Sequence, residues 1–382
     1  MKRLTILLIA LVACGDSTHK QTPDAPAGID AANADAAQPK PQAVVVGADF
    51  NSGTGVVSKL DVGSMMMQTN AVAGAADSDP VIRQIGDKLY IINRSAGENV
   101  TILDAKTLAL VEQHSTGAGS DPYDVAVVAN KLYIPATGTA GVVVMTLPAG
   151  TTTTIALDTA VGDPDGKPDC VTAAAVGADV YVACDLLDSN FTPRGVGKVA
   201  VIDTATDTVR TTFSLPDKNP QGFFVKTPAS STYGGDLLIS LVPAFDTYTA
   251  GCVARVTPGV TPTAACATGL SNMALGGFVN GIAVGEKLWL TVVVDVSFST
   301  ASGQLRSVDL TSGALASAPA SDASEQITDL AACPDGSVVA IDSKMNATGV
   351  RVFANGSERT TMPISIGLPP VFSDGIVCYD VP

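Results

Sequence analysis

The sequence predicts an all-β protein, a seven-bladed β-propeller closed by pairing of its N- and C-terminal strands. Three observations lead to this fold class. A turn-and-strand string recurs along the chain, a second strand string follows each copy, and the two chain ends supply complementary parts of one more unit. The composition agrees, because Val, Thr and Ala are frequent and 36 Gly and 23 Pro provide many turns.

Residues 1–13 have the features of an export signal. Met1-Lys2-Arg3 is a positive n-region, and the apolar run at 4–13 is shorter than the roughly 20 residues of a membrane-spanning helix. Its end, "LVAC" at 11–14, resembles the lipobox of bacterial lipoproteins. The resemblance implies cleavage before Cys14 and acylation of Cys14 with lipid chains such as palmitate, which anchor the protein in a membrane. An ordinary secretory signal with an unrelated cysteine is the alternative.

The segment at 14–42 predicts a tether between the lipidated cysteine and the folded body. It is rich in Ala, Asp and Pro and has almost no large apolar side chain, so we expect it to be disordered. In lipoproteins, Asp directly after the cysteine favours the inner membrane. In this chain Gly15 holds that place and Asp16 comes second, so we expect a lipid anchor in the outer membrane of a Gram-negative cell envelope.

The net charge restricts the partners of the protein. The chain carries a formal charge of −15, and loss of residues 1–13 with Lys2 and Arg3 takes it to −17. This argues against nucleic acid and against adhesion to anionic lipid head groups. It favours cations or basic partners, although an acidic surface is also a common means of staying soluble.

The repeat begins with a tight turn followed by an apolar strand. Its copies are "GDKLYII" (86–92), "ANKLYIP" (129–135), "GADVYVA" (177–183), "GGDLLIS" (234–240), "GEKLWLT" (285–291) and the weaker "DGSVVAI" (335–341). A strand running into a polar turn follows each copy, as in "VTILDAKT" (100–107) and "VAVIDTATD" (199–207). With one strand before and one after, each unit is a four-stranded meander of propeller-blade length.

The chain ends complete the ring. The last unit, "VFSDGIVCYDVP" (371–382), has one strand, and the first ordered stretch, beginning at residue 43, has three strands without a leading one. One plus three makes a seventh blade, and closure removes the exposed edges that an open array would present. About 340 residues often form two domains, but the repeat favours a single propeller over 43–382.

Two segments carry a family resemblance. "KVAVIDTATDTVRTTFSLPDKNPQGFFV" (198–225) and "SDPYDVAVVANKLYIPATG" (120–138) resemble the repeats of the YVTN-repeat, or surface-layer-type, β-propeller family. The resemblance covers 79–225 most closely and fades afterwards. It implies the propeller scaffold but no activity, because one fold serves many functions.

Six cysteines remain after Cys14, an even number in an exported chain, so disulfides are expected. Fifteen pairings are available in principle. The repeat favours Cys170–Cys184 and Cys252–Cys266, because each pair is symmetric about a hairpin tip. Cys333 and Cys378 occupy equivalent places in the innermost strands of neighbouring blades. A bridge there would lock the ring, and the sequence leaves open whether it forms.

Few residues suggest catalysis. His114 is the single histidine of residues 43–382, at a strand end, so we interpret it as a rim residue and find no Ser-His-Asp or Cys-His system without it. Trp289 fits a core strand, and Met65-Met66-Met67 fits an outer one. The best polar cluster is Asp163, Asp165 and Asp169 in "GDPDGKPD", which would suit Ca²⁺. A solvated turn is the competing interpretation, and we predict no other cofactor.

Long loops at 160–169, 185–197, 242–251, 269–278 and 294–304 fall on one face of the predicted propeller, and such loops often carry binding residues. We therefore expect a binding face that includes Phe191, Arg194, Phe245, Tyr248 and Phe298. Our first hypothesis is a non-enzymatic binding or scaffolding module for an envelope protein or a small ligand.

The alternative is a metal-assisted hydrolase or lactonase that uses carboxylates around the central channel. These are Asp124, Asp329 and Asp374, which recur at equivalent inner-strand positions. A register-based structural role explains the recurrence equally well.

Overall fold

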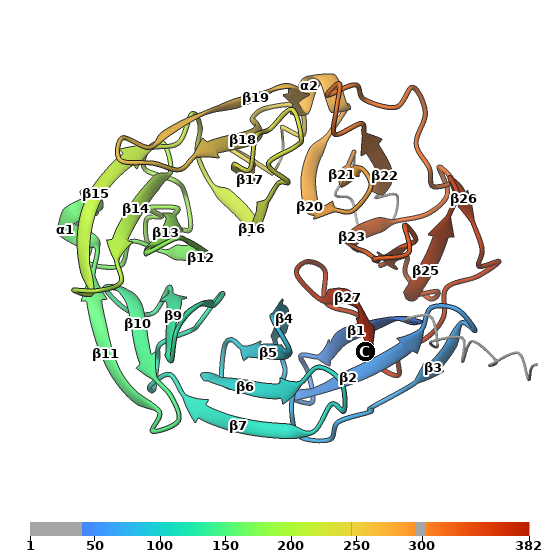
Figure 1. Ribbon diagram of the computed structural model, residues 1–382, viewed down its shortest axis with the longest axis horizontal. Helices are drawn as coiled ribbons and strands as arrows, with labels where there is room; N and C mark the ends of the chain where they lie inside the picture. The colour runs from blue at the N-terminus through green and yellow to red at the C-terminus, as the bar shows by residue number, and fades with distance from the viewer. Residues whose placement is uncertain (1–39, 246, 295–302, 382) are drawn as a thin grey trace, which may run out of the picture. The chain divides into compact units, whose positions relative to one another are not determined.

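The computed structural model describes residues 40–245, 247–294 and 303–381. Over these residues the chain forms seven antiparallel sheets arranged around a central channel (Figure 1). The predicted seven-bladed propeller is therefore confirmed. The signal peptide, Cys14, most of the tether and Phe298 lie outside the described residues. Among those that are described, no helix is long and apolar enough to cross a membrane.

Each blade is an antiparallel meander with one edge strand at the channel. The strands of each blade are given below from this innermost strand outward. The closing blade comprises β27 (Ile376–Val381), β1 (Lys40–Asp49), β2 (Thr54–Asp61) and β3 (Met66–Gln68). Blade 2 comprises β4 (Pro80–Ile85), β5 (Lys88–Asn93), β6 (Asn99–Asp104) and β7 (Leu110–Ser115). Blade 3 comprises β8 (Ala126–Val128), β9 (Lys131–Ala136), β10 (Gly141–Thr146) and β11 (Thr151–Ala156). Blade 4 comprises β12 (Cys170–Val176), β13 (Asp179–Cys184), β14 (Lys198–Asp203) and β15 (Thr208–Ser214).

The other three blades follow the same order. Blade 5 comprises β16 (Pro220–Lys226), β17 (Leu237–Leu241), β18 (Cys252–Thr257) and β19 (Thr263–Ser271). Blade 6 comprises β20 (Phe278–Val284), β21 (Leu288–Val293) and β22 (Gly303–Val308). Blade 7 comprises β23 (Ile327–Ala332), β24 (Val338–Asp342), β25 (Gly349–Ala354) and β26 (Ser357–Glu358). Two single-turn helices, α1 (Asp158–Val161) and α2 (Asn272–Leu275), lie between blades.

The middle strands of each blade read as continuous apolar runs because both of their faces are covered. In β13 all residues after the first are buried, whereas the outermost strand β11 is exposed at five of its six residues. A sheet packed on both sides needs apolar side chains on both faces. Seven apolar clusters fill the spaces between neighbouring blades in the described part of the chain.

Strand β1 joins two of these clusters. Successive side chains of a strand point to opposite faces. Ala43 and Val45 therefore pack against blade 7, and Val44 and Val46 pack against blade 2. On its inner edge β1 pairs with β27 in an antiparallel ladder that runs from Lys40–Val381 to Val45–Ile376. The first and last strands of the described residues thus share one blade, and the predicted closure is confirmed. The ladder also begins three residues before the expected boundary at residue 43.

All three expected disulfides are present. Cys170–Cys184 joins β12 to β13, and Cys252–Cys266 joins β18 to β19. Cys333–Cys378 joins the end of the innermost strand of blade 7 to β27. This third bridge, which the sequence left open, ties the closing blade to its neighbour.

Blade 6 departs from the expected four strands. Its outer strand is reduced to a single antiparallel bridge between Val308 and Leu315. The segment after it, "SGALASAPASDAS", is rich in Ala, Ser and Pro and lacks the alternating large apolar residues that a strand needs. The other interpretations of single residues agree with the structure, since Trp289 is buried between blades 6 and 7 and Met66 lies exposed in the outer strand β3.

Candidate functional site

A cavity of about 530 Å³ opens at the mouth of the channel, on the face that carries the long loops. Its walls come from blades 2 to 5 and from the segment that leads into β27. The loops between second and third strands supply one half of the wall, and the loops that enter the inner strands supply the other half. A concave site of this size suits a small molecule.

Of the five residues predicted for the binding face, the four that the structure describes divide into two pairs. Phe191 and Phe245 line the cavity, with 83% and 50% of their surface exposed. Tyr248 instead stacks on Phe278, with ring centroids 6.3 Å apart, and Phe245 meets the same ring edge-on at 5.8 Å. Arg194 does not belong to the cavity wall, because it is engaged with the neighbouring acidic loop.

That acidic loop does not form the Ca²⁺ site considered from the sequence. Arg194 forms ion pairs with Asp163 at 3.2 Å and with Asp165 at 2.9 Å, and the Lys167 amide donates to both carboxylates. Asp169 makes no hydrogen bond to Arg194 or Lys167 among the described residues and instead accepts one from the Leu187 amide at 2.9 Å. Within the described ranges, no group of three or more His, Cys, Asp or Glu residues is arranged to hold a metal ion. The Arg194 guanidinium thus pairs with the two carboxylates, Asp163 and Asp165, that a bound cation would otherwise have contacted.

Asp169 lies instead in the cavity wall beside Asp185. The sequence analysis did not identify Asp185 as a candidate site residue. The two residues flank the Cys170–Cys184 disulfide, and the Asp185 amide donates to the Asp169 carbonyl at 3.0 Å. Asp185 is 3% exposed, and its Oδ1 has no hydrogen-bond partner among the residues described. Burial, and then the charge of Asp169, raise the pKa of Asp185 well above its usual range. Burial likewise raises the pKa of Asp169 to about 6.

Asp374 lies where the cavity continues into the channel. Together with Gln221 and Gly222 it lines both this cavity and a second one of about 300 Å³ further along the inner strands. Its backbone is left-handed, with φ of 57°, and its Oδ1 accepts a hydrogen bond from the Phe223 amide at 3.2 Å. The carboxyl is half-buried, and desolvation raises the pKa of Asp374 to about 6, against the opposing influence of Arg83.

The other two channel carboxylates hold the inner strands together. Asp124 is fully buried, forms a two-pronged ion pair with Arg83 at 2.6 Å, and accepts from Thr172 Oγ1 at 2.7 Å. Asp329 accepts a hydrogen bond from the Gly375 amide at 2.8 Å. These contacts link blades 2, 3 and 4, and blade 7 with the closing blade. The recurrence of aspartate at inner strands therefore includes strand-to-strand ties as well as the cavity residue Asp374.

Arg94 and Tyr123 complete the polar lining, and no sequence signal pointed to either. Arg94 pairs with Asp79 at 2.6 Å, and its guanidinium lies 4.9 Å from the centre of the Tyr123 ring. The Asp121 carboxylate accepts hydrogen bonds from the Ser95 amide and the Thr137 hydroxyl, each at 2.9 Å. In contrast, His114 lies on the outer strand β7, where its ring bonds Glu112 at 2.9 Å, and it takes no part in the cavity wall.

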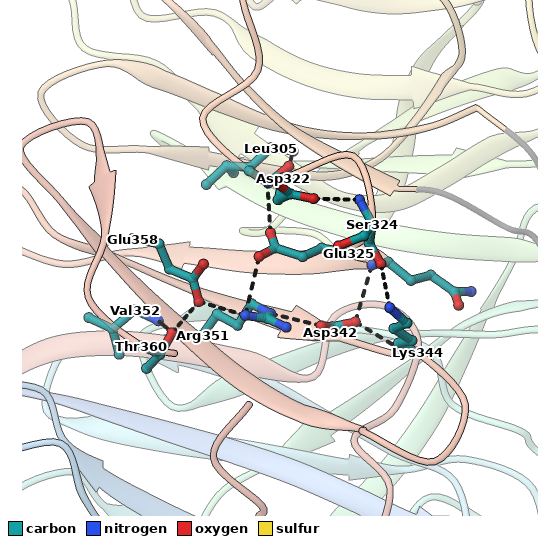
Figure 2. A network of polar contacts seen from close by, with 12 residues as sticks. Leu305, Asp322, Ser324, Glu325, Asp342, Lys344, Arg351, Val352, Glu358 and Thr360 are labelled. Atoms are coloured by element: carbon teal, nitrogen blue, oxygen red, sulfur yellow. Dashed lines mark hydrogen bonds and ion pairs between the residues drawn. The ribbon is translucent and has the colours of Figure 1, made fainter. Parts of the chain in front are cut away.

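A second concentration of charge, in blade 7, is internally paired. Figure 2 shows Glu325, Asp342 and Glu358 around Arg351, at 3.2, 2.8 and 2.6 Å. Burial, and then the neighbouring Glu358, raise the pKa of Glu325 to about 7. The network joins β24, β25 and β26 to the loop that enters the blade. Each of its three carboxyl groups forms an ion pair with Arg351. We interpret it as structural.

No family model matches this chain, and no curated protein does. Among solved structures, it is similar to the periplasmic gluconolactonase PpgL of Pseudomonas aeruginosa, with a TM-score of 0.58 and 15% identity over 90% of this chain and 99% of that one. A quinonprotein alcohol dehydrogenase-like protein of Bacteroides thetaiotaomicron has a TM-score of 0.56 and 12% identity over 86% and 76%. Apo AztD of Citrobacter koseri has a TM-score of 0.52 and 13% identity over 89% of this chain and 98% of that one. These similarities establish the propeller class alone.

The unsatisfied carboxyl of Asp185 gives a testable dependence of stability on pH. Its folded pKa lies above its unfolded value, so the free energy of unfolding falls as pH rises from about 4 through the folded pKa. Asp185→Asn removes this loss. Urea unfolding of the intact protein should show the variant more stable than the parent at neutral pH, with the gap closing near about pH 4.

The matched control is Asp87→Asn, which removes the same charge at a side chain that is 85% exposed in the β4–β5 turn. It should leave stability nearly unchanged across the same pH range. Equal stability of Asp185→Asn and the parent at neutral pH would contradict the electrostatic account of this site.

Proposed function

We propose that the protein is a lipoprotein, anchored through Cys14 in the outer membrane of a Gram-negative cell, whose propeller is a non-enzymatic module that binds a small ligand. The observation that carries the binding role is the cavity at the channel mouth, whose wall contains a buried carboxyl, Asp185, with an oxygen that no described residue satisfies. Buried polar groups in native proteins are almost always hydrogen-bonded, so such an exception calls for an explanation. A ligand that supplies the missing partner is one.

The composition of the cavity wall supports this role. Phe191 and Phe245 offer exposed aromatic surface, and the Gln221 amide, which donates to Asn219 Oδ1 at 3.2 Å, is held in the wall at the start of blade 5. A pocket with apolar walls and a few fixed polar groups is the usual form of a small-molecule site. Its polar groups stand on loops held by a closed ring, which keeps them in place before a ligand arrives.

The anchor rests on the sequence at 1–14, and it makes a separate prediction. Cys14→Ser removes the acylated thiol, so the chain should lose labelling by radioactive palmitate and keep its signal segment uncleaved at this site. The measurement is labelling in growing cells followed by immunoprecipitation. Cys266→Ser, which removes a different cysteine, is the control and should still be labelled. Labelling that persists in Cys14→Ser would refute the anchor.

A second candidate, a lactonase-type hydrolase, is favoured by one observation. Asp374 has a pKa of about 6 and faces the cavity, which is the range suited to general acid–base catalysis near neutral pH. In such a reaction Asp374 would take a proton from the water that attacks the lactone carbonyl and return it to the departing ring oxygen. This form of the reaction differs from the metal-assisted one that the sequence suggests, because the carboxyl itself moves the proton.

Titration calorimetry of the intact chain tests binding against catalysis. The probes are D-glucose, D-glucono-1,5-lactone, tyramine and phenylacetate. Ala244→Trp places a large ring in the cavity wall and should weaken any bound probe at least about tenfold. The control is Ala109→Trp, an exposed position on the opposite face, which should bind as the parent does.

Two results would overturn the binding proposal. One is that no probe binds, or that a bound probe is insensitive to Ala244→Trp. The other is steady release of acid from the lactone by the parent but not by Asp374→Asn, which would favour the hydrolase instead. Asparagine tolerates the left-handed backbone at position 374, so this variant tests the carboxyl and not the turn.

A further inference from the structure

We propose that Asp169 and Asp185 form an ammonium-binding subsite of the cavity, so that its ligand is a small organic cation: a protonated amine with an apolar, aromatic body. This inference rests on the proposed binding function and specifies the chemistry of the ligand. It is carried by the position of the two carboxyl groups, by the lack of partners around Asp185 and by the aromatic lining beside them.

The two carboxyl groups are held side by side by covalent structure. Asp169 directly precedes Cys170, and Asp185 directly follows Cys184, so the disulfide between β12 and β13 fixes both residues at the edge of the cavity. The hydrogen bond from the Asp185 amide to the Asp169 carbonyl continues the pairing of the two strands beyond the bridge. Two carboxyl groups that would repel each other when both are charged are thereby prevented from moving apart.

Asp185 lacks the contacts that normally accompany a buried carboxyl. It is 3% exposed, it lines the cavity, and no hydrogen bond or ion pair from the described residues reaches its side chain. Leaving such a group unsatisfied destabilises the fold, and it does so more strongly when the group is charged. Sites that carry a cost of this kind are characteristic of function.

The surroundings fit an organic cation better than a metal ion or an anion. The described residues offer no third metal-ligating side chain next to the pair. An ammonium group needs fewer ligands, because its three N–H donors suit two carboxylates. Tyr123, Phe191 and Phe245 line the same cavity and would contact the body of the amine, where aromatic faces also attract cations.

The charge around the cavity points the same way. The described lining contains four carboxyl groups, those of Asp121, Asp169, Asp185 and Asp374, against one cation, Arg94. Arg94 is already paired with Asp79 at 2.6 Å. The whole chain carries −15, so its overall charge also favours association with cations.

Binding should release a proton. The group facing Asp185 is Asp169, with Tyr123 close by, and the groups facing Asp169 are Asp163, Asp165 and Arg194. Without ligand the pair retains a proton near neutral pH, because like charges and burial disfavour two carboxylates. An ammonium group favours both carboxylates, so its arrival expels that proton to solvent. Affinity should therefore rise with pH above about 6, where the amine itself stays charged.

The experiment is titration calorimetry of the intact protein with three probes that share one ring. These are tyramine, its alcohol analogue tyrosol, and 4-hydroxyphenylacetate, which differ only in a cationic, neutral or anionic head. We expect tyramine to bind at least about tenfold more tightly than the other two. Asp185→Asn and Asp169→Asn should each remove this preference, and Asp87→Asn should keep it. Titrations in buffers of different ionisation enthalpy should show proton release with tyramine alone.

The contradicting results separate this inference from the function beneath it. Equal or tighter binding of tyrosol or 4-hydroxyphenylacetate, or tyramine binding unchanged in Asp185→Asn, would overturn the ammonium subsite. If that binding is still abolished by Ala244→Trp, the cavity remains a binding site for another class of ligand. Binding that ignores Ala244→Trp would overturn both. Because Asp185→Asn is expected to be more stable than the parent, loss of binding in it cannot be attributed to unfolding.

Discussion

The pairing of β27 with β1 is the contact on which the rest of the structure depends. The last strand of the ring, β27, has no hairpin partner next to it in the sequence, so its backbone must pair with a strand from the other end of the chain. In this protein that strand is β1. The same strand packs its alternate residues against blades 2 and 7, so one segment completes two of the apolar clusters. The Cys333–Cys378 bridge reinforces this junction covalently.

Closure also determines what the channel contains. Ser373 and Asp374 lie in the segment that leads into β27, so the strand that closes the ring carries them into the same cavity wall as the loops of blade 4. On the blade 4 side a second disulfide fixes Asp169 and Asp185. Buried carboxyl groups with raised pKa values are unfavourable for folding, and a covalently braced, closed ring provides the stability that offsets them.

Sequence periodicity was enough for the fold but not for the whole site. Turn-and-strand repeats predict blades because each blade must be apolar on both faces, and hairpin symmetry predicts two of the three disulfide pairs. The prediction of an outer strand in blade 6 was wrong because the spacing between copies of the turn-and-strand string does not depend on an outer strand. The sequence offered Ca²⁺ or a solvated turn for Asp163 and Asp165 but no ion pair, because Arg194, about 30 residues away, is brought to them only by the folded loop.

Asp185 shows a different limit of the sequence. It follows a strand of ordinary pattern, and nothing in "YVACDLL" distinguishes a buried, unsatisfied carboxyl from a solvated one. Its neighbour Cys184 was the available signal, because a bridged cysteine at a strand end also fixes the residue beside it. Phe191 and Phe245 were found because long loops on one face of a propeller converge on the channel mouth, which depends on topology alone.

Removal of β27 tests the central claim, closure, most directly. Deletion of residues 376–382 takes away a complete inner strand and one partner of a disulfide, so the free energy of unfolding should fall by about 5 kcal/mol or more. The control deletes residues 20–35, which leaves every strand from β1 onward intact. Thermal melting of both proteins beside the parent is the measurement. A large drop confined to the C-terminal deletion is the predicted result, and a C-terminal deletion that melts together with the parent would contradict closure of the ring by its two ends.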